Sequence, residues 1–244
     1  MIIVTLPVHN EADRLESNVK RLDSFMRSKD LKGLIILAED GSSDKSYEIA
    51  KRLSRCLDNI KVFHNDRKLG RGKAIREAWR AVQGDIYVFM DADLATDLSY
   101  LPAMIHLVED EGYGFVTGSR YAPAAKVERP LLRKAFSKFY NILVQALFAT
   151  GVTDHQCGFK ALNKEAVRAV LQLTKEDSWA WDTEVAVVLK KLNFRIAEIP
   201  VSWNEMKYKR TPIMRLFNDM YLHGRALVNI YIRAQNFDKS LKLG

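Results

Sequence analysis

The sequence predicts an α/β fold in which helices cover both faces of a doubly wound, mostly parallel sheet. Short strand-like runs alternate with helix-like runs through the first half of the chain. Polar residues directly follow several of these strand-like runs, and sheets of this kind bind ligands beyond the carboxyl ends of their strands. The 244 residues, 48% of them hydrophobic, suffice for one large domain with a buried core.

The spacing of apolar residues assigns each element of the first half. Residues 2–6 form an apolar strand-like run, and Leu15, Val19, Leu22 and Met26 then recur at helical spacing. The same alternation continues to residue 118. In chain order, the expected strands are 2–6, 33–37, 60–64, 85–90 and 115–118, and the expected helices are 11–27, 45–57, 74–82 and 101–111.

The alternation changes after Arg120. A loop rich in Pro and Ala is followed by a basic-to-apolar helix, and a later pair of short strands flanks Pro200. In chain order, we expect a loop at 121–130, a helix at 131–150, a short segment at 154–162, helices at 163–173 and 179–192, and a final helix from about 211 to 234.

Composition narrows the classes of partner. The chain carries 38 Lys and Arg against 30 Asp and Glu, and a net charge of +8 favours anionic partners: nucleic acid, phosphate substrates or an acidic membrane.

Cys56 and Cys157 lack His or Cys neighbours at metal-ligand spacing, so we expect reduced thiols. The chain starts with a strand in place of a signal peptide, and its longest uncharged run, 139–153, is shorter than the ~20 residues of a spanning helix. We therefore expect a cytoplasmic protein without a membrane span.

Asp91-Ala92-Asp93 closes the expected strand 85–90. Two carboxylates one residue apart at the end of a buried strand suit Mg²⁺ or Mn²⁺, because these ions take oxygen ligands and share them with substrate phosphates. Asp is also common in turns, so the same triplet fits a solvated strand-to-loop turn.

Polar clusters also follow the first two strands. They are Pro7-Val8-His9-Asn10-Glu11 and Glu39-Asp40-Gly41-Ser42-Ser43-Asp44. Asp40 is a candidate acceptor of hydrogen bonds from a nucleobase or ribose, whereas Asp44 is expected to cap the next helix. His9 alone is typical of a structural histidine. Three strands that end in polar clusters on one edge indicate a shared ligand site.

Gly70-Arg71-Gly72-Lys73-Ala74 is a glycine-rich basic turn at a helix start. It is not a Walker loop, because Arg67 and Ala74 stand where Gly and Ser or Thr belong. It is not a dinucleotide fingerprint either, because Arg76 replaces the third Gly. A turn of this kind remains suited to approach a phosphate.

In order and spacing, these clusters resemble the family 2 glycosyltransferases with the GT-A fold. Gly118-Ser119-Arg120-Tyr121 and Asp154-His155-Gln156-Cys157-Gly158-Phe159 extend the resemblance to the branch that makes polyprenyl-phosphate sugars, which includes dolichyl-phosphate mannose synthase and dolichyl-phosphate glucosyltransferase. It covers about residues 1–235. The resemblance implies an inverting enzyme that transfers a hexose from a nucleoside diphosphate sugar (UDP or GDP) to a polyprenyl or dolichyl phosphate. It also implies a peripheral position on the cytoplasmic face of a membrane.

The resemblance also implies roles for individual residues. The residues implied to bind the nucleotide sugar are Pro7, His9, Glu11, Asp40, Lys73, Asp91 and Arg210. Asp91 and Asp93 are implied to hold the Mg²⁺ or Mn²⁺, and Asp93 and Asp154 to be the catalytic carboxylates. Arg120, Arg133 and Ser137 are implied to bind the acceptor phosphate. It divides the chain into a GT-A catalytic domain, 1–205, and a C-terminal amphipathic membrane-associating segment, 206–244. Within the domain, about 1–120 is the nucleotide-sugar half and 121–205 the acceptor half.

Departures from the family pattern bear on the donor sugar. Ala95 stands where the mannose-synthase branch has a Gln that contributes to the metal site. The runs 93–97 and 201–205 resemble the glucosyltransferase branch, so we expect glucose in preference to mannose. Lys209-Arg210 replaces a usual Ser-Lys pair and keeps its positive charge.

Two helices carry apolar faces with basic flanks. In the helix 211–234, the projected apolar face holds Ile213, Phe217, Met220, Tyr221, Leu227, Val228 and Tyr231, and the opposite face holds Arg215, Asn218, Arg225, Asn229 and Arg233. The helix 131–150 offers Phe136, Phe139, Tyr140, Leu143 and Leu147. Such faces fit packing on the sheet, a homo-oligomer contact or a membrane surface; the lipid acceptor implied by the resemblance favours the membrane.

Other classes explain less of the sequence. A nucleic-acid binder accounts for the positive charge but leaves the carboxylate clusters unexplained, so we expect no nucleic-acid partner. A family 2 glycosyltransferase with a soluble or protein acceptor is the alternative. It requires a carboxylate base near the acceptor hydroxyl, and Asp154 is the candidate.

Overall fold

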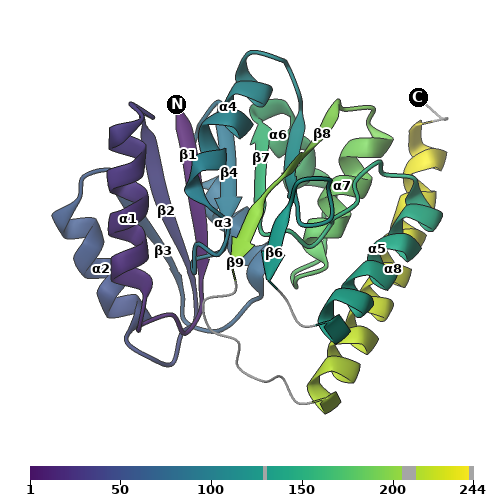
Figure 1. Cartoon of the computed structure of the whole chain (residues 1–244), viewed down its shortest axis with the longest axis horizontal. Helices are drawn as coiled ribbons and strands as arrows, with labels where there is room; N and C mark the ends of the chain where they lie inside the picture. Colours follow the sequence, from purple (N-terminus) through teal and green to yellow (C-terminus); the bar gives the residue numbers. More distant parts are fainter. Residues whose placement is uncertain (129–130, 205–212, 242–244) are drawn as a thin grey trace.

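The computed structural model describes residues 1–128, 131–204 and 213–241, and it confirms the predicted α/β class (Figure 1). A seven-stranded sheet has the order β3-β2-β1-β4-β7-β5-β8. Its strands are β1 (Ile2–Val8), β2 (Gly33–Asp40), β3 (Ile60–Asn65), β4 (Ile86–Met90), β5 (Phe115–Ser119), β7 (Phe159–Asn163) and β8 (Ile196–Pro200). β7 is antiparallel to both neighbours, and the other paired strands are parallel.

Helices cover both faces of this sheet. One layer holds α1 (Leu15–Ser28), α2 (Ser46–Cys56) and α4 (Leu101–Glu109), with the 3₁₀ turn η1 (Leu98–Tyr100); the other holds α3 (Arg71–Arg80), α6 (Lys164–Leu173) and α7 (Trp181–Lys191). Side chains of a strand alternate between the layers. In β1, Val4, Leu6 and Val8 contact the first layer, whereas Ile3 contacts the second. Burial on both faces explains why these strands are apolar runs in the sequence.

Two long helices lie side by side along one flank of the molecule (Figure 1). They are α5 (Leu131–Phe148) and α8 (Ile213–Leu241). Ala226, Ile230 and Ala234 of α8 pack against Val187 of α7, and Phe148 of α5 joins this cluster. Within the part of the chain that the structure describes, no helix is long and apolar enough to cross a bilayer.

The packing of α8 corrects the predicted division of its faces. Leu227 is buried, although it was assigned to the same face as Val228, which is 58% exposed. Arg233, assigned to the polar outer face, points inward and binds Glu184 and Glu176 at 2.9 and 2.6 Å. The helix therefore buries Ala226, Leu227, Ile230 and Ala234 together with a partly buried ion pair, while other apolar side chains such as Val228 stay outside. The side chains of 213–220 lie outside the described part.

Some element boundaries differ from the sequence prediction. The first helix begins at Leu15, because residues 11–14 form a turn closed by the Arg14 N–H and the Glu11 carbonyl. The segment 121–130, expected as a loop, contains β6 (Lys126–Glu128), which pairs with β9 (Ser202–Asn204) in a small parallel ribbon. Asp44 accepts the Ser46 N–H at 2.9 Å, but Lys45 is the N-cap residue of α2.

The direction of β7 determines what meets at the site. The parallel strands all end at the lower edge of the sheet in Figure 1, and the antiparallel β7 begins there. The segment that precedes β7, residues 154–158, therefore lies beside the residues that follow β4 and β5. Its Cys157 is buried, Cys56 is exposed, and both are free thiols as expected.

Candidate active site

Asp91 follows β4 and lies against the start of β7. Its backbone N–H donates to the Gly158 carbonyl at 3.0 Å, which extends the β4–β7 pairing by one step. A Cβ atom at Gly158 would stand only 2.0 Å from Oδ2 of Asp91. Position 158 therefore requires glycine if the Asp91 carboxylate is to keep its place.

Arg71 binds Asp91 from the other side. Its Nη2 donates to Oδ1 of Asp91 at 2.9 Å, and its Nη1 donates to Asp182 at the start of α7. The guanidinium also lies over two aromatic rings, 5.3 Å from the centre of Phe89 and 4.5 Å from that of Trp179. Desolvation raises the pKa of the Asp91 carboxyl, and the positive charge of Arg71 opposes this rise.

A buried lysine completes this charged cluster. Lys160 of β7 is fully buried, and its Nζ donates to the carbonyls of His155 (3.0 Å) and Cys157. The same Nζ lies 3.9 Å from Oδ1 of Asp182. Two buried cations thus balance Asp182 and Asp91, as the low polarity of a protein interior requires.

Sequence reasoning missed Lys160 and Asp182, and it placed Arg71 in a basic turn without its contacts to Asp91 and Asp182. The signal for Asp182 was present, because the apolar run Val185–Leu189 follows it in the same helix. A helix that is apolar all round is buried, so an acidic residue in its first turn needs a buried cation as partner.

Asp93 lies in a loop that is tied to two other elements. Its Oδ1 accepts the N–H of Ala95 at 3.1 Å, and its Oδ2 lies 3.9 Å from Arg14, just before α1. Arg14 also binds Glu11 at 2.5 Å. The Ala95 carbonyl in turn accepts the N–H of Asn204 in β9.

The residues after β4 fit a hard divalent cation. Asp91 and Asp93 supply carboxylate oxygens, and Mg²⁺ or Mn²⁺ is commonly held by one or two carboxylates together with waters and substrate phosphates. No group of three or more His, Cys, Asp or Glu at metal-binding distance occurs among the described residues. The described part of the chain thus offers a pair of carboxylates and no closed protein cage.

Asp40 orders the loop that leads to Arg71. Its two carboxylate oxygens accept the backbone N–H groups of Leu69 (2.7 Å) and Gly70 (2.9 Å). Its carbonyl oxygen lies 2.8 Å from Nδ1 of His9. At Gly41, which has φ +61°, a Cβ atom would stand 2.4 Å from the backbone of Arg67. Asp40 and Asp91 therefore meet at one edge through the short segment 69–71.

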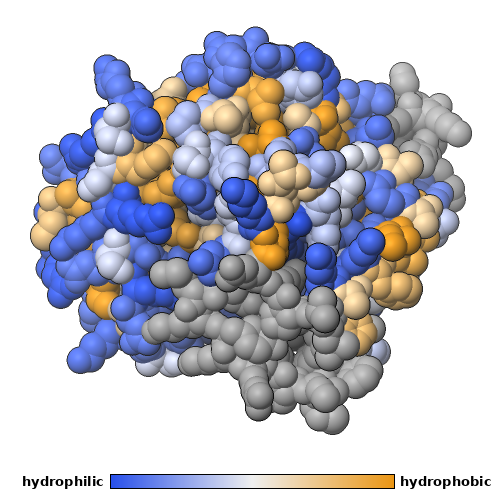
Figure 2. Space-filling view, in the orientation of Figure 1, coloured by the Kyte–Doolittle hydropathy of each residue, from blue (hydrophilic) through white to orange (hydrophobic). Residues whose placement is uncertain are grey.

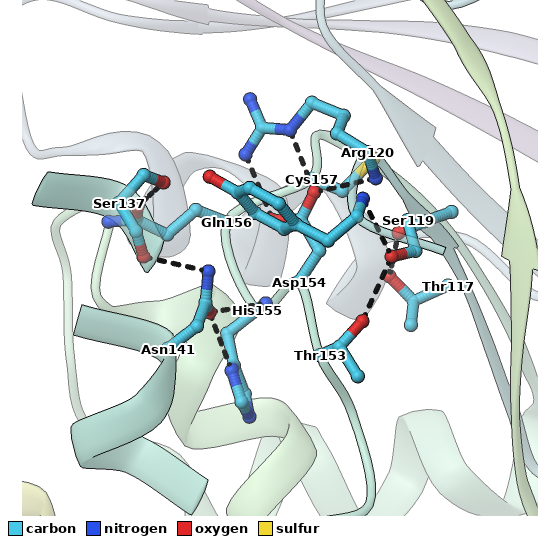
Figure 3. A network of polar contacts seen from close by, with 12 residues as sticks. Thr117, Ser119, Arg120, Ser137, Asn141, Thr153, Asp154, His155, Gln156 and Cys157 are labelled. Atoms are coloured by element: carbon cyan, nitrogen blue, oxygen red, sulfur yellow. Dashed lines mark hydrogen bonds and ion pairs between the residues drawn. The ribbon is translucent and has the colours of Figure 1, made fainter. Parts of the chain in front are cut away.

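Arg120 and Asp154 form a buried ion pair (Figure 3). Nε and Nη2 of Arg120 donate to the two oxygens of Asp154 at 2.7 and 2.9 Å, and the backbone N–H of Arg120 donates at 2.9 Å. Burial alone would raise the pKa of Asp154, but the charge and hydrogen bonds of Arg120 outweigh it and lower the pKa below its usual value. These contacts suit a carboxylate that holds Arg120 in place better than one that takes a proton.

Ser137 lies in the same network, on α5 (Figure 3). Its hydroxyl donates to Gln156 at 3.1 Å, and its carbonyl accepts the side-chain amide of Asn141. Asn141 Oδ1 lies 2.8 Å from Nδ1 of the fully buried His155. Burial lowers the pKa of His155 to about 3, so this imidazole is neutral at physiological pH. The segment 154–156 thus positions both Arg120 and Ser137.

A pocket of about 520 Å³ adjoins Arg120 on its α5 side. Its wall combines basic and polar side chains with two alanines and one larger apolar residue, Ile142 of α5. The lining residues are Arg120, Tyr121, Ala122, Ala125, Lys134, Lys138, Asn141, Ile142, Gln145 and Thr153.

The structure brings most of the predicted site residues to one edge. Pro7 is the penultimate residue of β1 and Lys73 lies in the first turn of α3, both half-buried. Arg210 lies outside the described residues, as does the side chain of Arg133. Their predicted roles stay predictions.

Comparisons with known proteins identify the family of the chain. Residues 3–171 match the family described as glycosyl transferase family 2. Glycosyltransferase AglD of Haloferax volcanii is 38% identical over 218 residues, which cover 88% of this chain and 35% of AglD. A dolichyl-phosphate beta-glucosyltransferase of Dictyostelium discoideum is 30% identical over 216 residues, 83% of this chain and 66% of the relative. The chain therefore spans about a third of AglD and about two thirds of the second relative.

Solved structures share the fold. Glucosyl-3-phosphoglycerate synthase of Mycobacterium tuberculosis, in complex with Mn²⁺, UDP-glucose and phosphoglyceric acid, superposes with a TM-score of 0.73 at 19% identity, over 95% of this chain and 79% of that one. Mannosyl-3-phosphoglycerate synthase of Rubrobacter xylanophilus gives a TM-score of 0.75 at 18% identity, over 98% and 75%. The expected GT-A architecture is confirmed, and the chain is a glycosyltransferase that belongs to glycosyl transferase family 2.

Proposed function

We propose that this enzyme transfers a hexose, glucose in preference to mannose, from a nucleoside diphosphate sugar to a polyprenyl or dolichyl phosphate. One observation carries the proposal: β7 places the carboxylates Asp91 and Asp93 and the clamped guanidinium of Arg120 at the same edge of the sheet. Two relatives at 29% and 30% identity, both dolichyl-phosphate beta-glucosyltransferases, support the choice of sugar and acceptor.

On the donor side, Asp91 and Asp93 would hold a divalent cation bound to the diphosphate. Such a cation, Mg²⁺ or Mn²⁺, neutralises the charge of the leaving diphosphate. Arg71 fixes Asp91 through its hydrogen bond at 2.9 Å, and Asp40 fixes the loop that carries Arg71. The carboxylates are thus oriented before the donor binds, which lowers the cost of ordering them later.

On the acceptor side, a phosphate is already anionic at neutral pH and attacks without a strong general base. The task of the protein is therefore to align it, which Arg120 and Ser137 would do by charge and hydrogen bonding. The buried partner Asp154 keeps Arg120 in one orientation. Attack in line with the leaving diphosphate inverts the anomeric carbon.

The acceptor implies contact with a membrane, and the flank formed by α5 and α8 suits it. On the face shown in Figure 2, apolar residues gather over these two helices. Exposed apolar side chains on this flank include Phe139, Ile142, Leu147, Tyr221, Leu222, Val228 and Ile232, with Lys134 and Lys138 nearby. An apolar surface with basic flanks can lie in the lipid interface. We propose that this flank rests on the membrane.

A direct assay tests the transfer. We expect purified protein with UDP-glucose and Mn²⁺ to convert a polyprenyl phosphate into its glucosyl ester, detected by mass spectrometry, and to leave the phosphate-free polyprenol unchanged. GDP-mannose should react more slowly. Transfer to the free alcohol or to a soluble phosphate at an equal rate would contradict the acceptor assignment. A product that keeps the α configuration of UDP-glucose in NMR would contradict inversion.

Liposome flotation tests the membrane surface separately. Ile142→Asp and Val228→Asp place a charge at positions that are each 58% exposed, so folding should be little affected. We expect both variants to lose binding to liposomes of phosphatidylcholine and phosphatidylglycerol. Gln83→Asp introduces the same charge at an exposed position before β4 and serves as control. Unchanged flotation, together with a dimer that the two variants dissociate, would assign this flank to a homo-oligomer.

A further inference from the structure

Trp179 is a large aromatic side chain that stays exposed beside the candidate active site. It is 57% exposed, although one side of its ring covers the guanidinium of Arg71, with Cζ 4.5 Å from the ring centre. The same guanidinium donates to Asp91 at 2.9 Å. The indole and a carboxylate that we assign to the donor therefore contact the same guanidinium.

Arg71, which lies beneath this indole, is held in place by several contacts. Arg71 is bound by the two carboxylates of Asp91 and Asp182, and its guanidinium also lies over the ring of Phe89 at 5.3 Å. Arg71 is itself 7% exposed. A cation over an aromatic face is attractive, and more so when it is withdrawn from water. Trp179 thus rests on a rigid base, and an aromatic surface held in this way loses little conformational entropy when a ligand covers it.

The surface of Trp179 differs in chemistry from its surroundings. Its neighbours Arg71, Asp91 and Asp182 are charged and suit phosphates, cations and hydroxyl groups. An indole is flat and apolar, and it matches the face of a pyranose ring on which the C–H groups point outward. In a nucleoside diphosphate sugar, the hexose is the part next to the diphosphate that presents such a face.

We propose that Trp179 is the surface on which the hexose of the donor stacks. This proposal rests on the proposed function, because it takes a nucleoside diphosphate sugar as donor. It assigns to Trp179 contact with the sugar and not with the nucleoside or diphosphate. Removing the indole therefore weakens binding of the nucleotide sugar and leaves binding of the free nucleoside diphosphate unchanged.

Titration calorimetry of the full chain with Mn²⁺ separates these two ligands. For Trp179→Ala, we expect the Kd of UDP-glucose to rise about tenfold, the effect of one lost aromatic contact. The Kd of UDP should stay within about twofold of the wild-type value. Trp179→Phe keeps an aromatic face and should retain most of the affinity for UDP-glucose.

A matched control is available at the opposite edge of the sheet. Tyr113, which precedes β5, lies under the guanidinium of Arg195 at 4.4 Å, nearly the same distance as that between Trp179 and Arg71. Tyr113→Ala removes an aromatic–arginine contact away from the site and should change neither Kd.

The outcomes separate the two proposals. Equal losses of UDP and UDP-glucose affinity in Trp179→Ala would overturn the stacking role, because they indicate a disturbed Arg71–Asp91 pair. An unchanged Kd for both ligands would also overturn it and leave Trp179 as ordinary surface. A wild-type protein that binds UDP-glucose but loses nothing on substitution refutes only the stacking role. A wild-type protein that binds neither UDP-glucose nor GDP-mannose overturns the proposed function and the stacking role together.

Discussion

Asp154 accepts three hydrogen bonds from a single residue, Arg120, two from the guanidinium and one from the backbone N–H. Both side chains are almost fully buried, and the two residues lie 34 positions apart in the sequence. The pair joins the end of β5 to the segment before β7. It keeps one cation in one orientation at the edge where the proposed acceptor phosphate arrives.

Asp154→Asn should cost both stability and acceptor affinity. The substitution leaves the Arg120 charge buried without its counter-charge, and breaking such a pair costs about 3 kcal/mol in the free energy of unfolding. We expect a lower urea midpoint and a raised KM for polyprenyl phosphate with a nearly unchanged KM for the donor. Glu198→Gln serves as control, because Glu198 Oε1 accepts the Asp154 backbone N–H at 2.9 Å and an amide oxygen can replace it. Equal effects of the two substitutions would contradict the special role of the ion pair.

The Arg120–Asp154 pair should make the stability of the protein depend on pH in the acid range. The pKa of Asp154 is lower in the folded chain than the value near 3.9 expected when unfolded. The ionised carboxylate therefore stabilises the fold above pH ~4, and this contribution is lost as the pH falls below that value. Urea midpoints measured from pH 6 to pH 3 should fall more steeply for the wild type than for Asp154→Asn. Parallel curves would show that Asp154 contributes nothing to acid unfolding.

Asp93→Ala should abolish transfer while the fold remains intact. Removing a group that stabilises the charge of a leaving diphosphate costs at least about 100-fold in rate. Residual activity should no longer respond to added Mn²⁺ or to a chelator. Asp97→Ala in the same loop removes only the cap of η1, whose Ser99 N–H it accepts at 2.9 Å, and should cost about 1 kcal/mol without loss of rate. Full activity of Asp93→Ala in the presence of chelator would refute the site.

Gly158→Ala should displace the Asp91 carboxylate, because it adds one methyl group beside it. The new Cβ would stand 2.0 Å from the Asp91 carboxylate, so the carboxylate must move. We expect the Mn²⁺ concentration for half-maximal activity to rise by about tenfold or more. Gly224→Ala places the same methyl group in α8 where nothing lies within 4 Å, and it should stabilise the protein by roughly 0.5–1 kcal/mol. An unaltered Mn²⁺ response in Gly158→Ala would separate Asp91 from the metal.

Arg233→Met should destabilise the docking of α8 in a pH-dependent way. Glu184 is 2% exposed; burial raises its pKa, and the charge of Arg233 opposes that rise. Without Arg233, the buried carboxylate is better tolerated when protonated, so the loss of stability should be larger at pH 8 than at pH 5. Urea unfolding at both pH values measures the difference. Arg225→Met, at an exposed position of the same helix, should show no such pH dependence.

The sheet and its helices could be read from the sequence because burial on both faces leaves continuous apolar runs. β1 and β4 are examples, and the end of β4 placed Asp91 and Asp93 at the carboxyl edge of the sheet. The position of β7 could not be read, because an antiparallel strand between β4 and β5 is chosen by partners far away in the chain. The same holds for Arg71 and Asp182, whose contact joins residues 111 positions apart. Arg233 was placed outside because a helical projection does not show a buried carboxylate on a neighbouring helix.

The insertion of β7 between β4 and β5 also limits how the enzyme can be recombined. The predicted acceptor half contributes this strand to the middle of a sheet that otherwise belongs largely to the nucleotide-sugar half. A chain cut after Arg120 would leave β4 and β5 with unpaired backbone groups where β7 belongs. A chimera made to exchange acceptor specificity between relatives would have to replace α5 and the loop before it. It would have to keep β7 with its original neighbours.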